Sequence, residues 1–193
     1  CLGCRECSTR GVPLPEKIVT NSMIQIIKAT IEHSAIIAEI GKQAFWESHG
    51  HSASKEDIDS FISKNYNKEA ITKEFENTNV HYLLVQFHDK IAGFSKIELS
   101  TPNQNISEPN ITKLDRLYLL KEFYGKNLGA GLFKATIEIS KQNHQQGIWL
   151  AVWKENPKAI HFYTKTGFKI LGEYNFKISE THFNPNHIMY LKY

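Results

Sequence analysis

The chain has 193 residues, of which 41% are hydrophobic and 22% charged, a composition typical of one compact domain and unlike disordered or collagen-like sequences. Its 23 basic and 20 acidic residues are mixed along the sequence, so no basic block predicts nucleic acid as a partner. The longest apolar runs, such as residues 82–85 and 117–120, fall far short of the ~20 residues that cross a bilayer, so we expect no membrane span.

The three cysteines, Cys1, Cys4 and Cys7, all stand in the first seven residues. No set of Cys or His residues with zinc-binding spacing follows them, so we expect no metal site. Residues 1–22 lack hydrophobic periodicity, and we interpret them as a disordered leader or a vector-derived segment. A single domain is then expected over residues 23–193, with Met23 as the candidate natural start. Residues 23–193 contain no cysteine, which is typical of a cytoplasmic protein.

Strand and helix patterns alternate from Met23 onward. Residues 23–29 predict a strand, and Thr30 is placed to cap a long helix whose apolar residues recur at helical spacing up to Phe45. Ser54 and Asn67 are predicted N-caps of a second and a third helix.

Strand patterns dominate the rest of the chain. The predicted strands cover residues 80–88, 91–100, 112–120, 148–153, 168–178 and 187–193, with helices over 132–144 and 157–166. The sequence therefore predicts an α/β (α+β) fold, in which helices flank a central mixed, mostly antiparallel sheet of about seven strands.

A glycine-containing turn over residues 124–131 joins a predicted strand to a helix. Free N–H groups at a helix N-terminus suit phosphate oxygens, and Lys121 and Lys126 add cations nearby. The segment matches neither the ATP-binding phosphate loop nor the dinucleotide fingerprint. The same glycines also suit a tight turn with close helix packing, and the local pattern alone favours that interpretation.

Residues 148–168 contain the second informative pattern. Asn156 before Pro157 predicts a helix N-cap followed by proline at the first helical position, and Gly167 is placed to end that helix. On local pattern alone Asn156 is a cap and Tyr163 a packing residue.

The strand at 117–120, the turn at 124–131 and above all N-P-K-A-I-H-F-Y-T-K-T-G-F at 156–168 resemble the GNAT acyl-CoA-dependent N-acetyltransferases. The element order of residues 23–193 is similar to that family throughout. Residues 45–47, 114–129 and 148–168 are in addition similar to bacterial spermidine/spermine acetyltransferases.

The resemblance implies acetyl-CoA as cosubstrate, with its pantetheine arm paired to backbone groups of Leu117, Tyr118 and Leu119. It implies that Asn156 donates to the cofactor from its amide and that Tyr163 lies near the thioester sulfur as general acid. The pyrophosphate would be held by backbone amides of one continuous segment, which comprises Gly125, Lys126, Asn127, Leu128, Gly129 and Ala130.

The sequence departs from the family pattern at three positions. Tyr124 and Asn127 replace the usual first residue and first glycine of the turn, although asparagine tolerates left-handed backbone better than most residues. Ala151 stands where some members carry a glutamate base. The base must then come from elsewhere, with Glu98, Asp115 or a water chain as candidates.

The expected reaction is direct attack by a primary amine in a ternary complex. About one lysine-like amine in 2,500 is neutral at pH 7, so a proton must be removed, and no cysteine beyond Cys7 offers an acyl-enzyme nucleophile. A small-molecule amine, with a polyamine preferred, is expected between the early helices and the late strands. The acidic and aromatic residues of that region are Trp46, Glu47, Glu56, Asp57, Asp59, Trp149 and Trp153.

Other acceptors suit the same chemistry: a protein N-terminus, a lysine side chain, an amino acid or an aminoglycoside. A non-catalytic acyl-CoA-binding regulator is the alternative of another class, motivated by the altered turn and the missing glutamate. A homodimer is an expectation from the family resemblance alone. His144, His161 and His187 are scattered along the chain, and we expect them at the surface.

Overall fold

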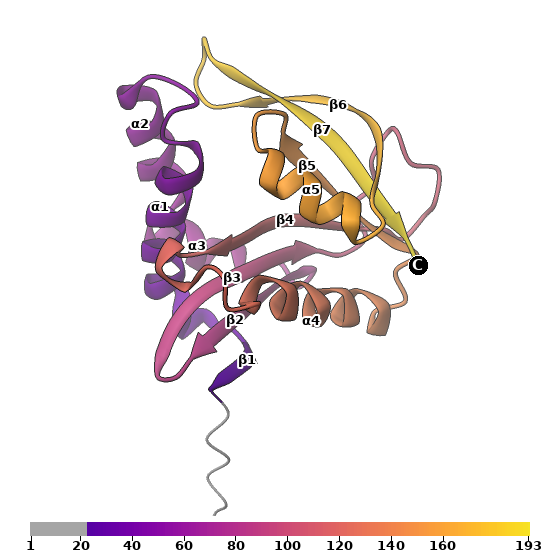
Figure 1. The fold of residues 1–193 in the computed structure, drawn as a ribbon, viewed down its shortest axis with the longest axis horizontal. Helices are drawn as coiled ribbons and strands as arrows, with labels where there is room; N and C mark the ends of the chain where they lie inside the picture. Colours follow the sequence, from indigo (N-terminus) through magenta and orange to yellow (C-terminus); the bar gives the residue numbers. More distant parts are fainter. Residues whose placement is uncertain (1–22) are drawn as a thin grey trace, which may run out of the picture.

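The computed structural model describes residues 23–193 (Figure 1). The expected leader at 1–22, with its three cysteines, lies outside the described residues. Within residues 23–193, seven strands form one sheet in the order β1-β2-β3-β4-β5-β7-β6. All neighbouring strands are antiparallel except β4 and β5, which are parallel. The predicted mixed, mostly antiparallel sheet flanked by helices is confirmed.

The elements follow the predicted order. The strands are β1 (Ile24–Lys28), β2 (Val80–Phe87), β3 (Lys90–Glu98), β4 (Thr112–Leu119), β5 (Gly147–Trp153), β6 (Lys169–Lys177) and β7 (Phe183–Lys192). The helices are α1 (Ser34–His49), α2 (Lys55–Asn65), α3 (Lys68–Glu74), α4 (Leu128–Gln142) and α5 (Pro157–Lys165), with short 3₁₀ turns at Ile31–His33 and Lys121–Phe123. No helix of the described part of the chain is both long and apolar enough to pass through a bilayer.

Local side-chain bonds explain where the early helices begin. The Ser54 hydroxyl accepts the N–H of Asp57 at 3.1 Å and the Asn67 carbonyl oxygen accepts the N–H of Ala70 at 2.8 Å, so both predicted caps are confirmed. Thr30 precedes a 3₁₀ turn instead, and α1 starts only at Ser34.

Two predicted boundaries were wrong by four residues. Helix α4 begins at Leu128 because Asn127, at φ 58° and ψ 13°, makes the left-handed turn that starts the helix, so the later glycines of the turn belong to its first turn. Strand β7 begins at Phe183 because β6 pairs with it as far as Lys177, although Pro185 and its flanking asparagines have low strand propensity.

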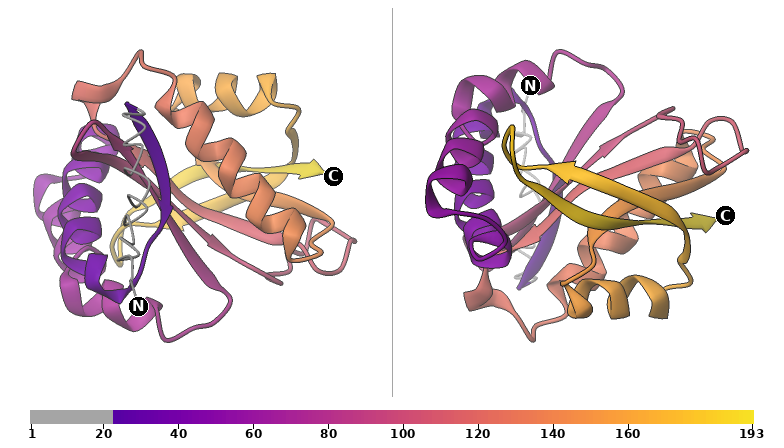
Figure 2. Two further views of the ribbon diagram at one scale, coloured as in Figure 1. Left: turned by 90° about the horizontal axis from the view of Figure 1, so that it is seen from below. Right: turned by 90° about the horizontal axis from the view of Figure 1, so that it is seen from above.

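The helices cover both faces of the sheet (Figure 2). Helices α1, α2 and α3 lie over the face that carries Tyr82, Phe94 and Tyr118, and α4 lies over the opposite face, where Thr136 of α4 and Ser95 of β3 share a 2.7 Å hydrogen bond. Strands β2 and β3 are consequently buried on both faces.

The parallel pair at the centre of the sheet separates soon after it forms. Strands β4 and β5 pair only through Thr112 with Ile148 and Lys113 with Trp149. The register of β4 against β3 then skips Asp115, which is therefore a β-bulge. A bulge bends its strand and increases the local twist, so β4 turns away from β5 and leaves both inner edges unpaired. The gap between these strands positions the functional site.

Candidate active site

A cavity of about 590 Å³ opens where β4 and β5 separate. The walls come from the end of α1, from α2, from both splayed strands, from the start of α5 and from the β6–β7 hairpin. Of the residues predicted to bind the cofactor or act in catalysis, four line it, Leu117, Tyr118, Asn156 and Tyr163, whereas Leu119 and residues 125–130 do not; the candidate base Asp115 lines it too. Trp149 and Trp153, which we placed near the acceptor, line it as well.

The backbone of β4 offers unpaired groups to this gap. The N–H of Leu120 donates to the carbonyl of Ala92 on β3 at 3.0 Å. Because backbone groups alternate in direction along a strand, Tyr118 also pairs with β3, whereas Leu117 and Leu119 direct their N–H and C=O toward β5. The geometry thus separates the three residues predicted to bind pantetheine: two present backbone groups to the gap, and Tyr118 presents its side chain to the cavity.

The N-terminus of α4 holds a cluster of unpaired amides. The first intrahelical bond runs from the N–H of Gly131 to the carbonyl of Asn127 at 3.2 Å, and Asn127 makes no side-chain cap. The amides of Leu128, Gly129 and Ala130 therefore have no acceptor among residues 23–193. Free amides at the positive end of a helix dipole form a site for an anion such as a phosphate.

The glycines of this turn are not explained by packing. A Cβ atom at Gly125 or Gly129 would have no protein atom within 4 Å, and one at Gly131 would meet only Ile26 at 3.8 Å. Only Gly125, at φ +80°, has a backbone conformation that requires glycine. Open space above Gly129 is what close approach by a ligand needs, so the tight-packing interpretation does not account for that residue.

The amide group of Asn156 makes one hydrogen bond and has one free donor among the described residues. Its side-chain oxygen accepts the N–H of Ala159 at 3.1 Å and caps α5, as predicted. Its side-chain nitrogen has no acceptor among the described residues, and Asn156 lines the cavity. The cap fixes the side chain, which leaves the nitrogen free to donate to a ligand.

Tyr163 is held by aromatic packing and is only 9% exposed. Its ring contacts Phe133, Phe162 and Phe168, with centroids 5.2 to 6.1 Å apart. Burial, together with the neighbouring Tyr118 hydroxyl, raises the pKa of Tyr163 well above its ordinary value. The phenol therefore keeps its proton at neutral pH, which suits a proton donor and not a base.

A buried ion-pair network adjoins the cavity, and two of its members, Asp115 and Arg116, line the cavity wall. Arg116 donates to both carboxylate oxygens of Glu74, at 3.0 and 3.1 Å, and its guanidinium lies 4.9 Å from the centre of the Tyr66 ring. Lys96 bridges Glu74 and Asp115, each at 3.1 Å. Such a network ties α3 to β3 and β4, so it fixes the strand from which the site is built.

Asp115 is a poor candidate for the base, although it lines the cavity. Burial alone would raise its pKa, but the charges of Lys96, Lys113 and Arg116 outweigh burial and hold the pKa of Asp115 well below its usual range. Lys113 is its nearest partner, at 2.6 Å. A carboxylate neutralised by three cations has little tendency to take a further proton.

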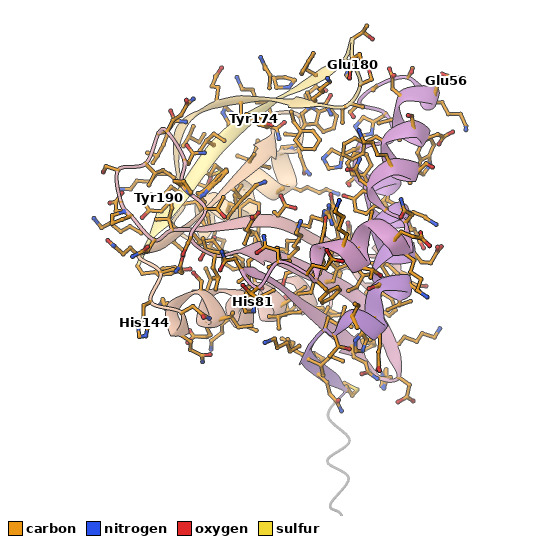
Figure 3. The ribbon with its side chains drawn as sticks, turned by 180° about the vertical axis from the view of Figure 1, so that it is seen from behind. Glu56, His81, His144, Tyr174, Glu180 and Tyr190 are labelled. Carbon is orange, nitrogen blue, oxygen red and sulfur yellow. The ribbon has the colours of Figure 1, made fainter. Side chains whose placement is uncertain are left out.

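Several residues predicted near the chemistry lie elsewhere. Glu98 is absent from the cavity wall, and its nearest polar partner is Asn77, at 3.5 Å. Glu47 accepts the N–H of Lys121 at 3.2 Å, outside the cavity. Figure 3 shows Glu56 at the outer end of α2. None of the carboxylates predicted at the acceptor position, which are Glu47, Glu56, Asp57 and Asp59, lines the cavity, and neither does Trp46.

The structure also identifies cavity residues that the sequence analysis missed. Phe45 and Phe61 stack in the wall with centroids 4.7 Å apart, and Phe176 of β6 meets Phe61 at 5.7 Å. His49, the last residue of α1, joins them. Its spacing of four residues from Phe45 places both on one helix face, which was the signal available in the sequence.

Comparisons with known proteins agree with this geometry. Residues 42–168 match the model of the acetyltransferase (GNAT) family. An uncharacterized N-acetyltransferase of Lactobacillus delbrueckii subsp. lactis is 24% identical over 157 residues, which cover 81% of this chain and 91% of that protein. A spermidine N(1)-acetyltransferase of Thermoplasma acidophilum is 26% identical and covers 76% of this chain and 89% of its own length.

A solved structure extends the similarity to three dimensions. The crystal structure of the PaiA N-acetyltransferase from Thermoplasma acidophilum in complex with coenzyme A superposes with a TM-score of 0.70 at 26% identity, covering 88% of this chain and 99% of that one. The family match spans the bulged strand β4, the amide cluster of α4 and the Asn156 cap. The chain therefore belongs to the GNAT family of acetyltransferases.

Proposed function

We propose that this protein transfers an acetyl group from acetyl-CoA to a small primary amine by direct attack in a ternary complex. The observation that carries the proposal is the combination of three features: the free amides at the start of α4, the unpaired inner edge of β4, and Tyr163 in the wall of the cavity between β4 and β5. The PaiA structure, which contains coenzyme A, supports the choice of cofactor.

Each feature has a place in the binding of acetyl-CoA. The amides of Leu128, Gly129 and Ala130 would hold the pyrophosphate, and the backbone groups of Leu117 and Leu119 would pair with the pantetheine arm. When bound, acetyl-CoA supplies an activated thioester carbonyl. A helix N-terminus and an unpaired strand edge would bind the cofactor through backbone groups. The side chains of the cavity wall would then be available to bind the acceptor.

Tyr163 would then act as the general acid. The amine nitrogen forms a bond to the carbonyl carbon, the bond from that carbon to sulfur breaks, and the Tyr163 hydroxyl gives its proton to the departing sulfur. The raised pKa of Tyr163 keeps the proton in place until the thiolate forms.

For the acceptor, we infer a polyamine from the relatives that act on spermidine. Aromatic rings of the cavity, among them Phe61, Trp149, Trp153, Tyr174 and Phe176, suit a cationic amine through cation–π contacts. One observation favours a second candidate, an aromatic monoamine: among the described residues, the only carboxylate in the cavity wall is Asp115, and it is already paired with Lys96 and Lys113. A polycation would find no free carboxylate there.

Release of CoA thiol from acetyl-CoA, measured with spermidine, spermine, phenethylamine, an amino acid and an aminoglycoside, separates these acceptors. Turnover of phenethylamine without turnover of either polyamine would reject the polyamine.

Tyr163→Phe should bind CoA normally and lose at least about 100-fold in kcat, the usual contribution of a general acid. CoA binding by the wild type without turnover of any amine would instead identify an acyl-CoA-binding regulator.

A further inference from the structure

The proposed reaction needs a group that takes the proton of the attacking amine. Tyr163 keeps its own proton, Asp115 is neutralised by three cations, and Glu98 lies outside the cavity. Ala151, at the position where some family members carry a glutamate, has no titratable group. Of the candidates expected from the sequence, only a water chain is left, unless the cavity wall offers another titratable group.

His49 lines the cavity at the end of α1. Its ring lies between those of Phe45, at 4.8 Å, and Trp153, at 5.6 Å. Side chains alternate along β5, so Trp153 faces the α1 side, whereas Val152 packs with Tyr163 on the α5 side. His49 and Tyr163 thus approach the gap between β4 and β5 from opposite faces of the sheet. This arrangement keeps a proton acceptor for the amine apart from the proton donor for the sulfur, with both in the wall of one cavity.

The hydrogen bonds of His49 assign its tautomer. The Ser48 hydroxyl lies 2.7 Å from Nδ1 of His49 and also 2.7 Å from the carbonyl oxygen of Ala44. A carbonyl only accepts, so both contacts are hydrogen bonds only when the hydroxyl donates to Ala44 and accepts from Nδ1 of His49, and we assign the tautomer on this basis. The proton of the imidazole is then on Nδ1, and Nε2 carries the free lone pair.

Nothing in residues 23–193 occupies that lone pair. Nε2 has no hydrogen-bond partner there, and it is not among the fully enclosed unpaired atoms. Burial, and secondarily the charge of His51, lowers the pKa of His49 to about 4, so the ring is neutral at pH 7. A neutral imidazole with an open nitrogen is ready to accept a proton.

We propose that His49 is the general base of this enzyme and accepts the amine proton at Nε2. The inference rests on the proposed function. As the amine nitrogen bonds to the acetyl carbon, its N–H bond breaks and the proton passes to Nε2, while the carbon–sulfur bond breaks and sulfur takes the Tyr163 proton. A weak base suffices because the nitrogen becomes far more acidic as its new bond forms. Solvent then restores both residues to their starting protonation states.

The test compares His49→Gln with a matched control, His51→Gln. His51 also contacts the Trp153 ring, at 5.2 Å, but does not line the cavity. With the best amine of spermidine and phenethylamine, His49→Gln should lower kcat by about 100-fold or more at unchanged CoA affinity and KM. The control should stay within about threefold of the wild type, and thermal melts of both variants check folding.

Chemical rescue distinguishes a base from a packing residue. Added imidazole should restore turnover of His49→Ala at pH 8, and 1,2,4-triazole, which has the same shape but is a weaker base, should restore much less. Ser48→Ala, which removes the acceptor of the Nδ1 proton and leaves the ring in place, should lower kcat several-fold.

Three results would overturn the assignment: wild-type kcat in His49→Gln, a loss confined to KM, or equal rescue by both azoles. Absence of wild-type turnover with both amines would overturn the proposed function itself, and the assignment of His49 with it.

Discussion

Gly129→Glu should separate cofactor binding from folding. A side chain at position 129 meets no protein atom within 4 Å, and the residue lies in the first turn of α4. Replacing glycine there gains up to about 1 kcal/mol of helix propensity, and a carboxylate near a helix N-terminus adds about 0.3–1 kcal/mol. The variant should therefore unfold at the wild-type temperature or a few degrees above it.

The same carboxylate should oppose a bound pyrophosphate. At about 5 Å and an effective dielectric constant of about 20, two like charges repel by about 3 kcal/mol, equivalent to a loss of roughly 100-fold in affinity. Calorimetric titration with CoA measures the loss, and Gly129→Ala is the control that adds bulk without charge and should lose less. CoA affinity equal to the wild type in Gly129→Glu would refute the amide cluster of α4 as the phosphate site.

Three further predictions concern single side chains. Asn156→Asp keeps the cap oxygen but loses the amide donor, so its melting temperature should hold while CoA affinity falls about tenfold; unchanged affinity would mean that the amide binds no cofactor. Glu74→Gln leaves Arg116 and Lys96 without their shared carboxylate, so urea unfolding should show a loss of about 3 kcal/mol in the free energy of unfolding. A loss below about 1 kcal/mol, as for an exposed ion pair, would contradict the burial of this network. Folding lowers the pKa of His49 from 6.5 to about 4, so the contribution of the neutral ring to the free energy of unfolding is complete above pH 6.5 and is lost as the pH falls toward 4. Across that range the free energy of unfolding of the wild type should fall by about 3 kcal/mol more than that of His49→Gln. Urea unfolding curves that shift equally with pH in both proteins would contradict the burial of the ring.

The order of the elements and most helix boundaries could be predicted from the sequence because their causes are local. The caps at Ser54, Asn67 and Asn156 each bond to an amide three residues ahead, so the signal and the structure lie within one turn. The start of α4 also has a local cause, because Asn127 tolerates the left-handed backbone that begins the helix. The start of β7 could not be predicted, because pairing with β6 overrides the propensity of its residues.

The site depends on contacts between residues far apart in the chain. The skipped register at Asp115 separates β4 from β5, and three cations from two strands decide that this carboxylate stays charged. His49 joins the cavity only because α1 ends beside Trp153, more than 100 residues further along the chain. Sequence by itself therefore determined the element order and the caps of the helices, since these depend on neighbouring residues, whereas the roles expected of the glycine turn and of Tyr163 came from the resemblance to a family. The tertiary structure alone decided which titratable groups share the cavity and which are neutralised, because burial and charge pairing are properties of packed surfaces.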